Sequence, residues 1–210
     1  AKEAANKLKA LEQKFGKRPN IIVLLVDDMG WGDPGCFGGG EAVGAPTPKI
    51  DRMAAEGLRL TSTYSQHTCT PTRATMLSGR LNIRHGIYRP PMYGEAGGIG
   101  DEVTVASLLK KAGYTTAAVG KWQLGETREN QPQNHGFDEF FGFLGVANIY
   151  TEWREPNFNP EIANNPFFRA SIEKFPFSKH LVKGKKGDEL ENVKLLDIPG
   201  LANCDMDFKE

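Results

Sequence analysis

Two adjacent acidic residues occupy a position where they could bind a cation. Asp27 and Asp28 directly follow the aliphatic run Ile21 to Val26. Neighbouring carboxylates repel one another unless a cation or a basic side chain neutralises them. Hard oxygen ligands of this kind suit Ca²⁺ or Mg²⁺. Taken alone, the pair fits a divalent metal site and also a solvated strand end.

A cysteine lies just upstream of a predicted helix in the segment CTPTRATMLSGR. Pro71 suits the first helical position and Gly79 the end, so the helix is expected over 71–79 with Cys69 before it. A helix amino terminus offers free N–H groups and a positive dipole end, and Arg73 lies four residues beyond Cys69. The two residues could hold an anion, although a cysteine here can also be a small buried apolar residue.

One lysine and three histidines complete the set of candidate groups. Lys121 comes just beyond a strand predicted to end at Val119, where it could reach a ligand or remain a solvated loop residue. The histidines His67, His85 and His135 show no metal-binding spacing such as HExxH. They are therefore interpreted as structural or surface residues.

The elements that would position these groups alternate between strand and helix. Strands are predicted over 20–26, 58–65 and 114–120, and helices over 47–57, 71–79 and 101–113. This alternation predicts an α/β layer fold with a largely parallel sheet. Ligands of such sheets gather beyond the carboxyl ends of the strands, which is where Asp27, Asp28 and Lys121 are expected.

The two ends of the chain differ from this middle part. Residues 1–17 have helical spacing of apolar residues and predict an amphipathic helix, so residues 1–18 are expected to be an appendage. From about Thr151 the periodicity weakens, which predicts an excursion over the sheet with KGKKGDE as an exposed turn. Candidate specificity contacts in this part, which could equally be a packing cluster, are Tyr150, Trp153 and Arg154.

Composition excludes several classes of protein. The chain has 26 basic and 26 acidic residues, so nothing favours nucleic acid or an anionic membrane. Its longest aliphatic run has six residues, Ile21 to Val26, against about 20 for a membrane span. Cys36, Cys69 and Cys204 are too few for a disulfide scaffold or a four-cysteine zinc site. A bridge between Cys36 and Cys204 stays open.

Three motifs together resemble a known family. PNIIVLLVDDMGWGD, CTPTRATMLSGR and GYTTAAVGKWQLG occur in the order seen in formylglycine-dependent (type I), arylsulfatase-like sulfatases of the alkaline phosphatase-like superfamily. NHGFDEFFGF extends the resemblance, which covers roughly residues 19 to 145. It implies an alkaline phosphatase-like α/β sandwich with a central, mostly parallel sheet flanked by helices. Residues 19–210 would be the amino-terminal part of a sulfatase catalytic domain.

The resemblance also implies a sulfuric ester hydrolase. A maturase would oxidise Cys69 to formylglycine, whose hydrate attacks the sulfur of an aryl or carbohydrate sulfate and later expels sulfate. Asp27, Asp28 and residue 69 would bind Ca²⁺, Arg73 would stabilise the hydrate and Lys121 would contact the sulfate. Family members are expected in the periplasm or outside the cell, and further metal and catalytic residues come from their later half.

Gln123 departs from the family pattern, since it stands where the motif GKWHLG has histidine. A glutamine can donate and accept hydrogen bonds but cannot exchange a proton near neutral pH. If GKWQLG is extended, Lys121 and Gln123 should face the same side. Gln123 keeps open a non-catalytic binder of sulfated ligands. A phosphonate monoester or phosphodiester hydrolase of the same superfamily also stays open, because these enzymes use a CxPxR nucleophile as well.

Overall fold

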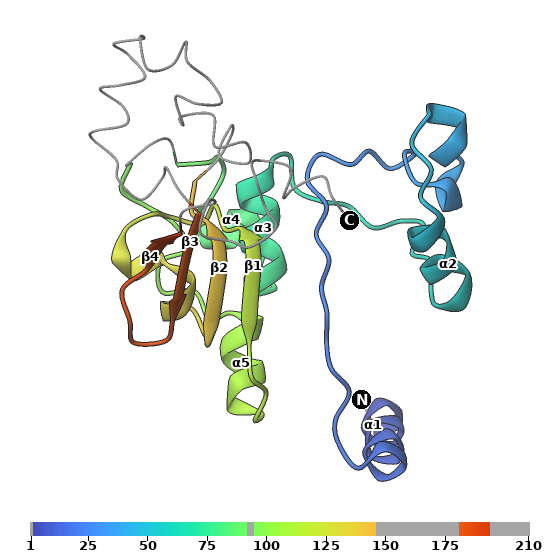
Figure 1. The fold of residues 1–210 in the computed structure, drawn as a ribbon, viewed down its shortest axis with the longest axis horizontal. Helices are drawn as coiled ribbons and strands as arrows, with labels where there is room; N and C mark the ends of the chain where they lie inside the picture. Colours follow the sequence, from blue (N-terminus) through green and yellow to red (C-terminus); the bar gives the residue numbers. More distant parts are fainter. Residues whose placement is uncertain (1, 92–94, 146–180, 194–210) are drawn as a thin grey trace. The chain divides into compact units, whose positions relative to one another are not determined.

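A computed structural model describes residues 2–91, 95–145 and 181–193 of the 210-residue chain. The chain divides into two compact units, residues 1–60 and 61–210 (Figure 1). Within the described ranges, no helix combines the length and apolar character needed to cross a membrane.

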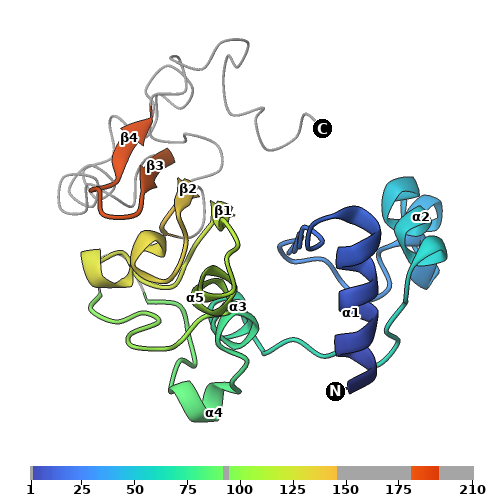
Figure 2. The same ribbon diagram turned by 90° about the horizontal axis from the view of Figure 1, so that it is seen from below.

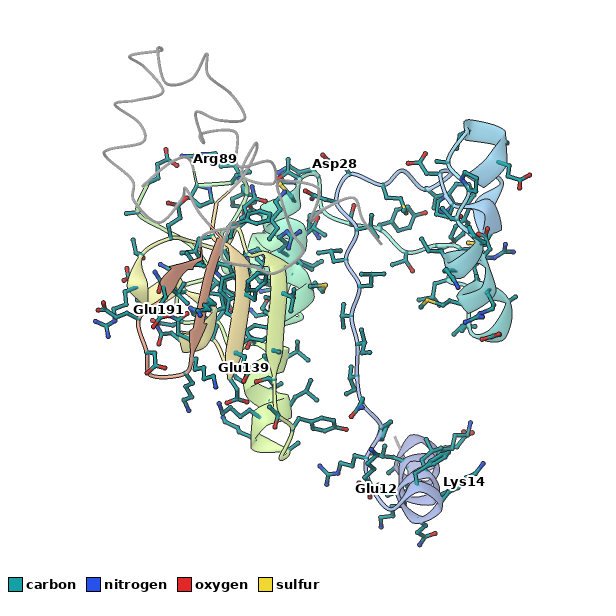
Figure 3. The ribbon with its side chains drawn as sticks, in the orientation of Figure 1. Glu12, Lys14, Asp28, Arg89, Glu139 and Glu191 are labelled. Atoms are coloured by element: carbon teal, nitrogen blue, oxygen red, sulfur yellow. The ribbon has the colours of Figure 1, made fainter. Side chains whose placement is uncertain are left out.

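The first unit begins with the predicted amphipathic helix. Helix α1 (Lys2–Phe15) ends at Gly16, whose positive φ of 68° suits glycine. Local ion pairs stabilise it: Lys7 pairs with Glu3 one turn earlier, and Glu12, labelled in Figure 3, accepts a hydrogen bond of 2.6 Å from the Arg18 guanidinium. The helix is confirmed, and the domain boundary after residue 18 stays a prediction.

A short loop and helix form the rest of the first unit. The 3₁₀ turns η1 (Gly35–Phe37) and η2 (Gly40–Val43) precede α2 (Pro48–Glu56), which matches the helix expected over 47–57. The Asp51 carboxylate joins them, because it accepts hydrogen bonds from the backbone N–H of Cys36 at 2.7 Å and the Thr47 hydroxyl at 3.1 Å. A Cβ atom on Gly35 would lie 2.4 Å from this carboxylate, so a larger residue there would displace the Asp51 side chain from these hydrogen bonds.

Two predicted strands are wrong. Residues 20–26 and 58–65 have no strand structure, and the aliphatic side chains Ile21 to Val26 are exposed, from 38% for Leu25 to 90% for Ile22. An aliphatic run favours burial of its side chains. A strand additionally needs a neighbouring backbone with free N–H and C=O groups. In the described part of the chain, the sheet is built only by later segments.

Four strands form the sheet of the second unit, in the order β1 (Ala117–Lys121), β2 (Glu139–Phe143), β3 (Leu181–Lys185) and β4 (Glu191–Val193). Strands β1 and β2 are parallel, and the other two pairings are antiparallel. The predicted α/β class is confirmed, but within the described residues the sheet is mixed instead of mostly parallel. The turn between β3 and β4 is exposed, which confirms the later part of the turn predicted at KGKKGDE, whereas its first three residues lie in β3.

Helices α3 (Cys69–Ser78), α4 (Asn82–His85) and α5 (Val105–Lys111) complete this unit, together with the 3₁₀ turns η3 (Arg128–Asn130) and η4 (Pro132–Asn134). Thr104 caps α5, since its hydroxyl accepts the Ser107 N–H at 3.1 Å, and the helix therefore begins later than the 101 expected from the sequence. Figures 1 and 2 show α3 and α5 near β1, with α5 below α3 in the view of Figure 1. Both contribute to one buried core with the sheet, which comprises Ala74, Leu77, Ile99, Ala106, Trp122, Leu124, Phe137, Phe140, Leu144, Val182 and Leu190.

A charged contact ties α5 to the starts of β1 and β2. The Asp138 carboxylate pairs with the Lys110 ammonium and accepts hydrogen bonds of 3.0 Å from both the backbone N–H and the hydroxyl of Thr116. The Lys110 contact, followed by the Thr116 N–H, lowers the pKa of Asp138 to about 2. The carboxylate therefore stays ionised at neutral pH and holds the entry to both strands.

Candidate active site

Cys69 is the first residue of α3 and is partly exposed. The helix therefore begins two residues earlier than the sequence predicted. Thr72 shapes the preceding loop, because its hydroxyl accepts the N–H of Gln66 at 3.1 Å and donates to the carbonyl of Thr68 at 2.7 Å. This role was not predicted from the sequence, where its signal is that a helical threonine can bond to the carbonyl four residues back.

Arg73 connects the same helix to the end of β1. Its guanidinium is partly buried and donates a hydrogen bond of 2.5 Å to the main-chain carbonyl of Lys121. Lys121 is the last residue of β1, not a loop residue beyond it, and pairs in register with Phe143. Two of the predicted site residues, 48 positions apart in the sequence, are thus in direct contact.

Gln123 is buried in an unusual state. Its side chain is 2% exposed, and neither its amide nitrogen nor its amide oxygen has a hydrogen-bond partner among the described residues. A buried amide without partners is costly, so such a group calls for a functional explanation. Its φ of 55° lies in the left-handed region, so the predicted extended course of GKWQLG ends at this residue.

The segment that carries Lys121 and Gln123 is held by its backbone. After β1 ends, the N–H groups of Trp122 and Gln123 donate to the carbonyls of Phe143 and Leu144 at 2.9 and 3.0 Å. The segment thus continues beside the chain that leaves β2. Its geometry is determined by the sheet and not by a free loop.

Asp27 and Asp28 belong to the first unit. Asp27 is partly buried, whereas Asp28, labelled in Figure 3, is exposed with a φ of 53°. Adjacent carboxylates in a bend present hard oxygen donors, so this pair fits part of a Ca²⁺ ligand set. Within the described ranges, no cluster of three or more His, Cys, Asp or Glu side chains could hold a metal. The metal assignment of Asp27, Asp28 and Cys69 therefore stays a prediction.

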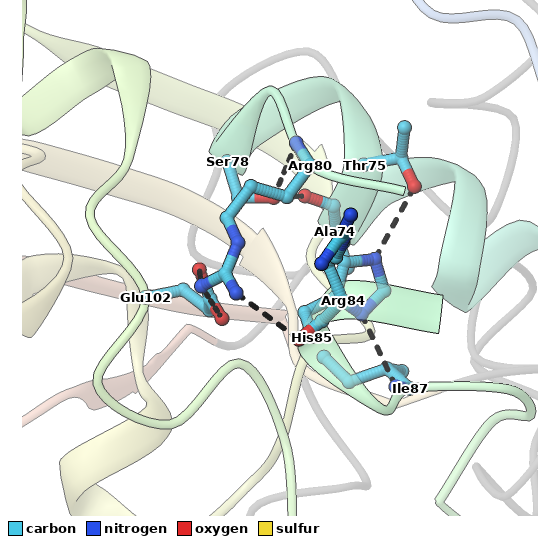
Figure 4. Close-up of polar contacts among 8 residues, drawn as sticks. All are labelled: Ala74, Thr75, Ser78, Arg80, Arg84, His85, Ile87 and Glu102. Atoms are coloured by element: carbon cyan, nitrogen blue, oxygen red, sulfur yellow. Dashed lines mark hydrogen bonds and ion pairs between the residues drawn. The ribbon is translucent and has the colours of Figure 1, made fainter. Parts of the chain in front are cut away.

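The histidine on α4 makes structural contacts (Figure 4). Nδ1 of His85 accepts the N–H of Ile87 at 3.1 Å, so the proton lies on Nε2, which donates to the Thr75 hydroxyl at 3.2 Å. Beside it, the Arg80 guanidinium binds both carboxylate oxygens of Glu102, at 2.6 and 2.8 Å. Burial lowers the pKa of His85, against an opposing effect of Glu102.

The other two histidines also contact the backbone. His135 is buried, and its Nε2 lies 2.9 Å from the carbonyl of Glu129; burial lowers the pKa of its imidazole. His67 is exposed with Nε2 2.6 Å from the carbonyl of Tyr88. These contacts agree with the structural and surface roles expected for the histidines.

Some predicted residues fall outside the described ranges. They are Tyr150, Trp153, Arg154 and Cys204. The possible bridge between Cys36 and Cys204 and the candidate specificity contacts therefore stay untested.

Comparison with known proteins gives consistent matches. Residues 19–191 match a family model described as Sulfatase. Human N-acetylgalactosamine-6-sulfatase is 48% identical over 134 residues, covering 59% of this chain and 25% of that protein. Human arylsulfatase G is 41% identical over 129 residues, covering 60% of this chain and 24% of that protein. The chain thus spans about a quarter of the length of these curated relatives.

A solved structure is similar over most of the chain. The crystal structure of PsFucS1 sulfatase from Pseudoalteromonas sp. superposes with a TM-score of 0.78 at 46% identity, covering 92% of this chain and 39% of that one. This likeness confirms the predicted alkaline phosphatase-like α/β class. The chain corresponds to the amino-terminal portion of a sulfatase.

Proposed function

The chain belongs to the sulfatase family, and we propose that the full-length protein hydrolyses an aryl or carbohydrate sulfate to an alcohol and inorganic sulfate. The observation that carries this proposal is the hydrogen bond from Arg73 on α3 to the carbonyl of Lys121 on β1. It joins the helix that begins with Cys69 to the strand that ends with Lys121. This contact supports the proposal because the helix that carries Cys69 and Arg73 meets the strand that carries Lys121.

Two groups would be added to these residues in the mature protein. Oxidation of the Cys69 thiol to formylglycine would supply, in the hydrate form, an oxygen nucleophile for the sulfate sulfur. Asp27 and Asp28 would hold Ca²⁺, which when bound supplies positive charge near the reacting sulfate. The fit rests on a partly exposed cysteine at a helix start and on adjacent carboxylate donors in a bend.

The unmodified side chains have electrostatic and orienting tasks. The Lys121 ammonium would bind sulfate oxygens, and the Arg73 guanidinium, on the second turn of α3, would orient residue 69. Cationic groups held in place before reaction stabilise the charge that develops on the transferring group. Gln123 would add a neutral hydrogen-bond donor. Its side-chain amide makes no hydrogen bond to any of the described residues.

Substrate, maturation and location extend the proposal. A sulfated carbohydrate is the favoured substrate class, supported by the similarity to N-acetylgalactosamine-6-sulfatase. A formylglycine-generating maturase would act on the CTPTR segment, and the protein would work in the periplasm or outside the cell. Nucleic acid is not expected as a partner of a chain with balanced charge.

The test uses the full-length protein produced with and without a maturase. Mass analysis of the peptide that contains Cys69 should show the thiol replaced by an aldehyde or its hydrate, and only this material should hydrolyse 4-nitrophenyl sulfate. Cys69→Ala is the matched control, since it cannot be converted. Turnover by protein with an unmodified thiol would contradict the formylglycine mechanism and favour direct thiolate chemistry.

Gln123 favours one alternative, a non-catalytic binder of sulfated ligands. A buried glutamine can donate to a sulfate oxygen but cannot transfer a proton. Matured protein that binds a sulfated sugar without releasing sulfate would support the binder. Turnover of an aryl phosphonate in preference to the sulfate would instead support a phosphonate or phosphodiester hydrolase.

A further inference from the structure

We infer that Asn130 is a positioning residue that holds the segment Lys121–Gly125 in its working geometry. Lys121 and Gln123, both proposed site residues, lie on this segment. The predicted effect of Asn130 on catalysis rests on the proposed function. Its effect on the backbone of residues 121–125 can be measured separately.

Asn130 is buried and uses every polar group it has. Its side-chain oxygen accepts the N–H of Gly100 at 2.8 Å, and its side-chain nitrogen donates to the Thr127 hydroxyl at 2.9 Å. Its backbone carbonyl accepts the indole N–H of Trp122 at 2.8 Å. Asn130 therefore links the segment that carries the site to the loop at Gly100, while Thr127 holds the Asn130 side chain within its own turn.

The chain around Asn130 is shaped to admit it. A Cβ atom on Gly98 would lie 2.6 Å from the Asn130 side-chain carbon Cγ, and one on Gly125 would lie 2.5 Å from its Cβ. Both glycines have positive φ, 152° and 111° respectively. Asn130 thus occupies a space that two glycines leave open, next to the end of the site segment.

A second contact connects the loop bound by Asn130 to the segment Lys121–Gly125. The N–H of Ile99 donates to the carbonyl of Leu124 at 2.8 Å, in the same loop that Asn130 fastens through Gly100. Trp122 and Leu124, which flank Gln123, are therefore both attached to the structure organised by Asn130. With both neighbours held, the backbone of Gln123 can keep its left-handed conformation.

The experiment compares Asn130→Ala, Asn130→Asp and the control Asn134→Ala in the full-length matured protein. Asn134 is an exposed asparagine nearby whose side chain donates to the Arg128 carbonyl instead of the site segment. Hydrogen exchange of residues 121–125 should accelerate in Asn130→Ala, with β2 residues 139–143 unchanged. Since small displacements of reacting groups can cost about 10²-fold, kcat/KM for 4-nitrophenyl sulfate should fall at least about 10-fold. Asn130→Asp keeps the acceptor for Gly100 and should lie between Asn130→Ala and the wild type.

The outcomes separate this inference from the proposed function. Folded Asn130→Ala with wild-type exchange at 121–125 would overturn the inference, as would equal acceleration across β2, which indicates only lower global stability. A wild-type protein without sulfatase turnover would contradict the proposed function while the exchange measurement still decides on Asn130. If Asn130→Ala does not fold, the comparison of Asn130→Asp with Asn134→Ala decides in the same way.

Discussion

Replacement of Gln123 by methionine should stabilise the fold and impair the site. Methionine has nearly the same length and an unbranched chain, so it fills the volume of the glutamine without polar atoms. The side chain is 2% exposed, and its amide has no partner among the described residues. The positive φ at position 123 is about equally unfavourable for glutamine and methionine, because neither is glycine.

The magnitude follows from the state of the amide. Burying an amide without hydrogen bonds costs roughly 1–3 kcal/mol in protein mutational data. Gln123→Met removes that cost and should raise the free energy of unfolding by up to about this amount. Most core substitutions lower this free energy, so the expected sign is itself diagnostic.

Gln131 provides the matched control. It is 5% exposed, its side-chain nitrogen donates to the Glu126 carbonyl at 3.1 Å, and its oxygen accepts from Gln133 at 2.9 Å. Gln131→Met removes both hydrogen bonds and should lower the free energy of unfolding by about 1–3 kcal/mol.

Urea unfolding of both variants in the full-length protein, with sulfate-ester turnover measured on the same samples, makes the comparison. Gln123→Met should be more stable and less active than the wild type. A loss of stability in Gln123→Met as large as in Gln131→Met would show that the Gln123 amide is satisfied, and would refute the reasoning.

Three further results are expected. Gln123→His should raise turnover by about 10²-fold, the low end of what a positioned acid or base contributes. An unchanged rate would show that another group transfers the proton. Asp28→Ala should abolish bound Ca²⁺ and activity together; retention of the metal by mass spectrometry would contradict its assignment as a ligand. Because burial lowers the pKa of His85 below its usual value of about 6.5, its contribution to stability is present above that pH. The contribution is lost progressively as the pH falls from 6.5 towards the lower pKa of the folded protein. His85→Gln should flatten this dependence in thermal melts, and an unchanged pH dependence would contradict the assignment.

Local signals in the sequence predicted the helices well. Pro48, Gly79 and Thr104 carry their own conformational preferences and stand at or next to the ends of α2, α3 and α5. Strand β1 was also predicted, because Ala117 to Val119 form an apolar run after a glycine turn, although it includes Lys121. These features depend on residues close together in the chain.

Non-local features could not be predicted in the same way. The run Ile21 to Val26 has stronger strand composition than EFFGF at 139–143, yet only the latter forms a strand in the described structure. The difference lies in pairing, since β2 has β1 and β3 as neighbours. The contact between Arg73 and Lys121 was equally absent from local patterns. The resemblance to sulfatases implied that both residues belong to the site, but it did not predict this contact.

The segment after β1 combines firm support with one unsupported side chain. Its backbone bonds to Phe143 and Leu144, and its indole bonds to Asn130, so every nearby signal favours a rigid structure. Gln123, in the middle of it, retains a buried amide without a partner among the described residues. Natural proteins keep such local conflicts mainly where function requires them. A rigid backbone around an unpaired donor allows a site to bind an anion without first reorganising. The donor is already held in place when the protein has folded.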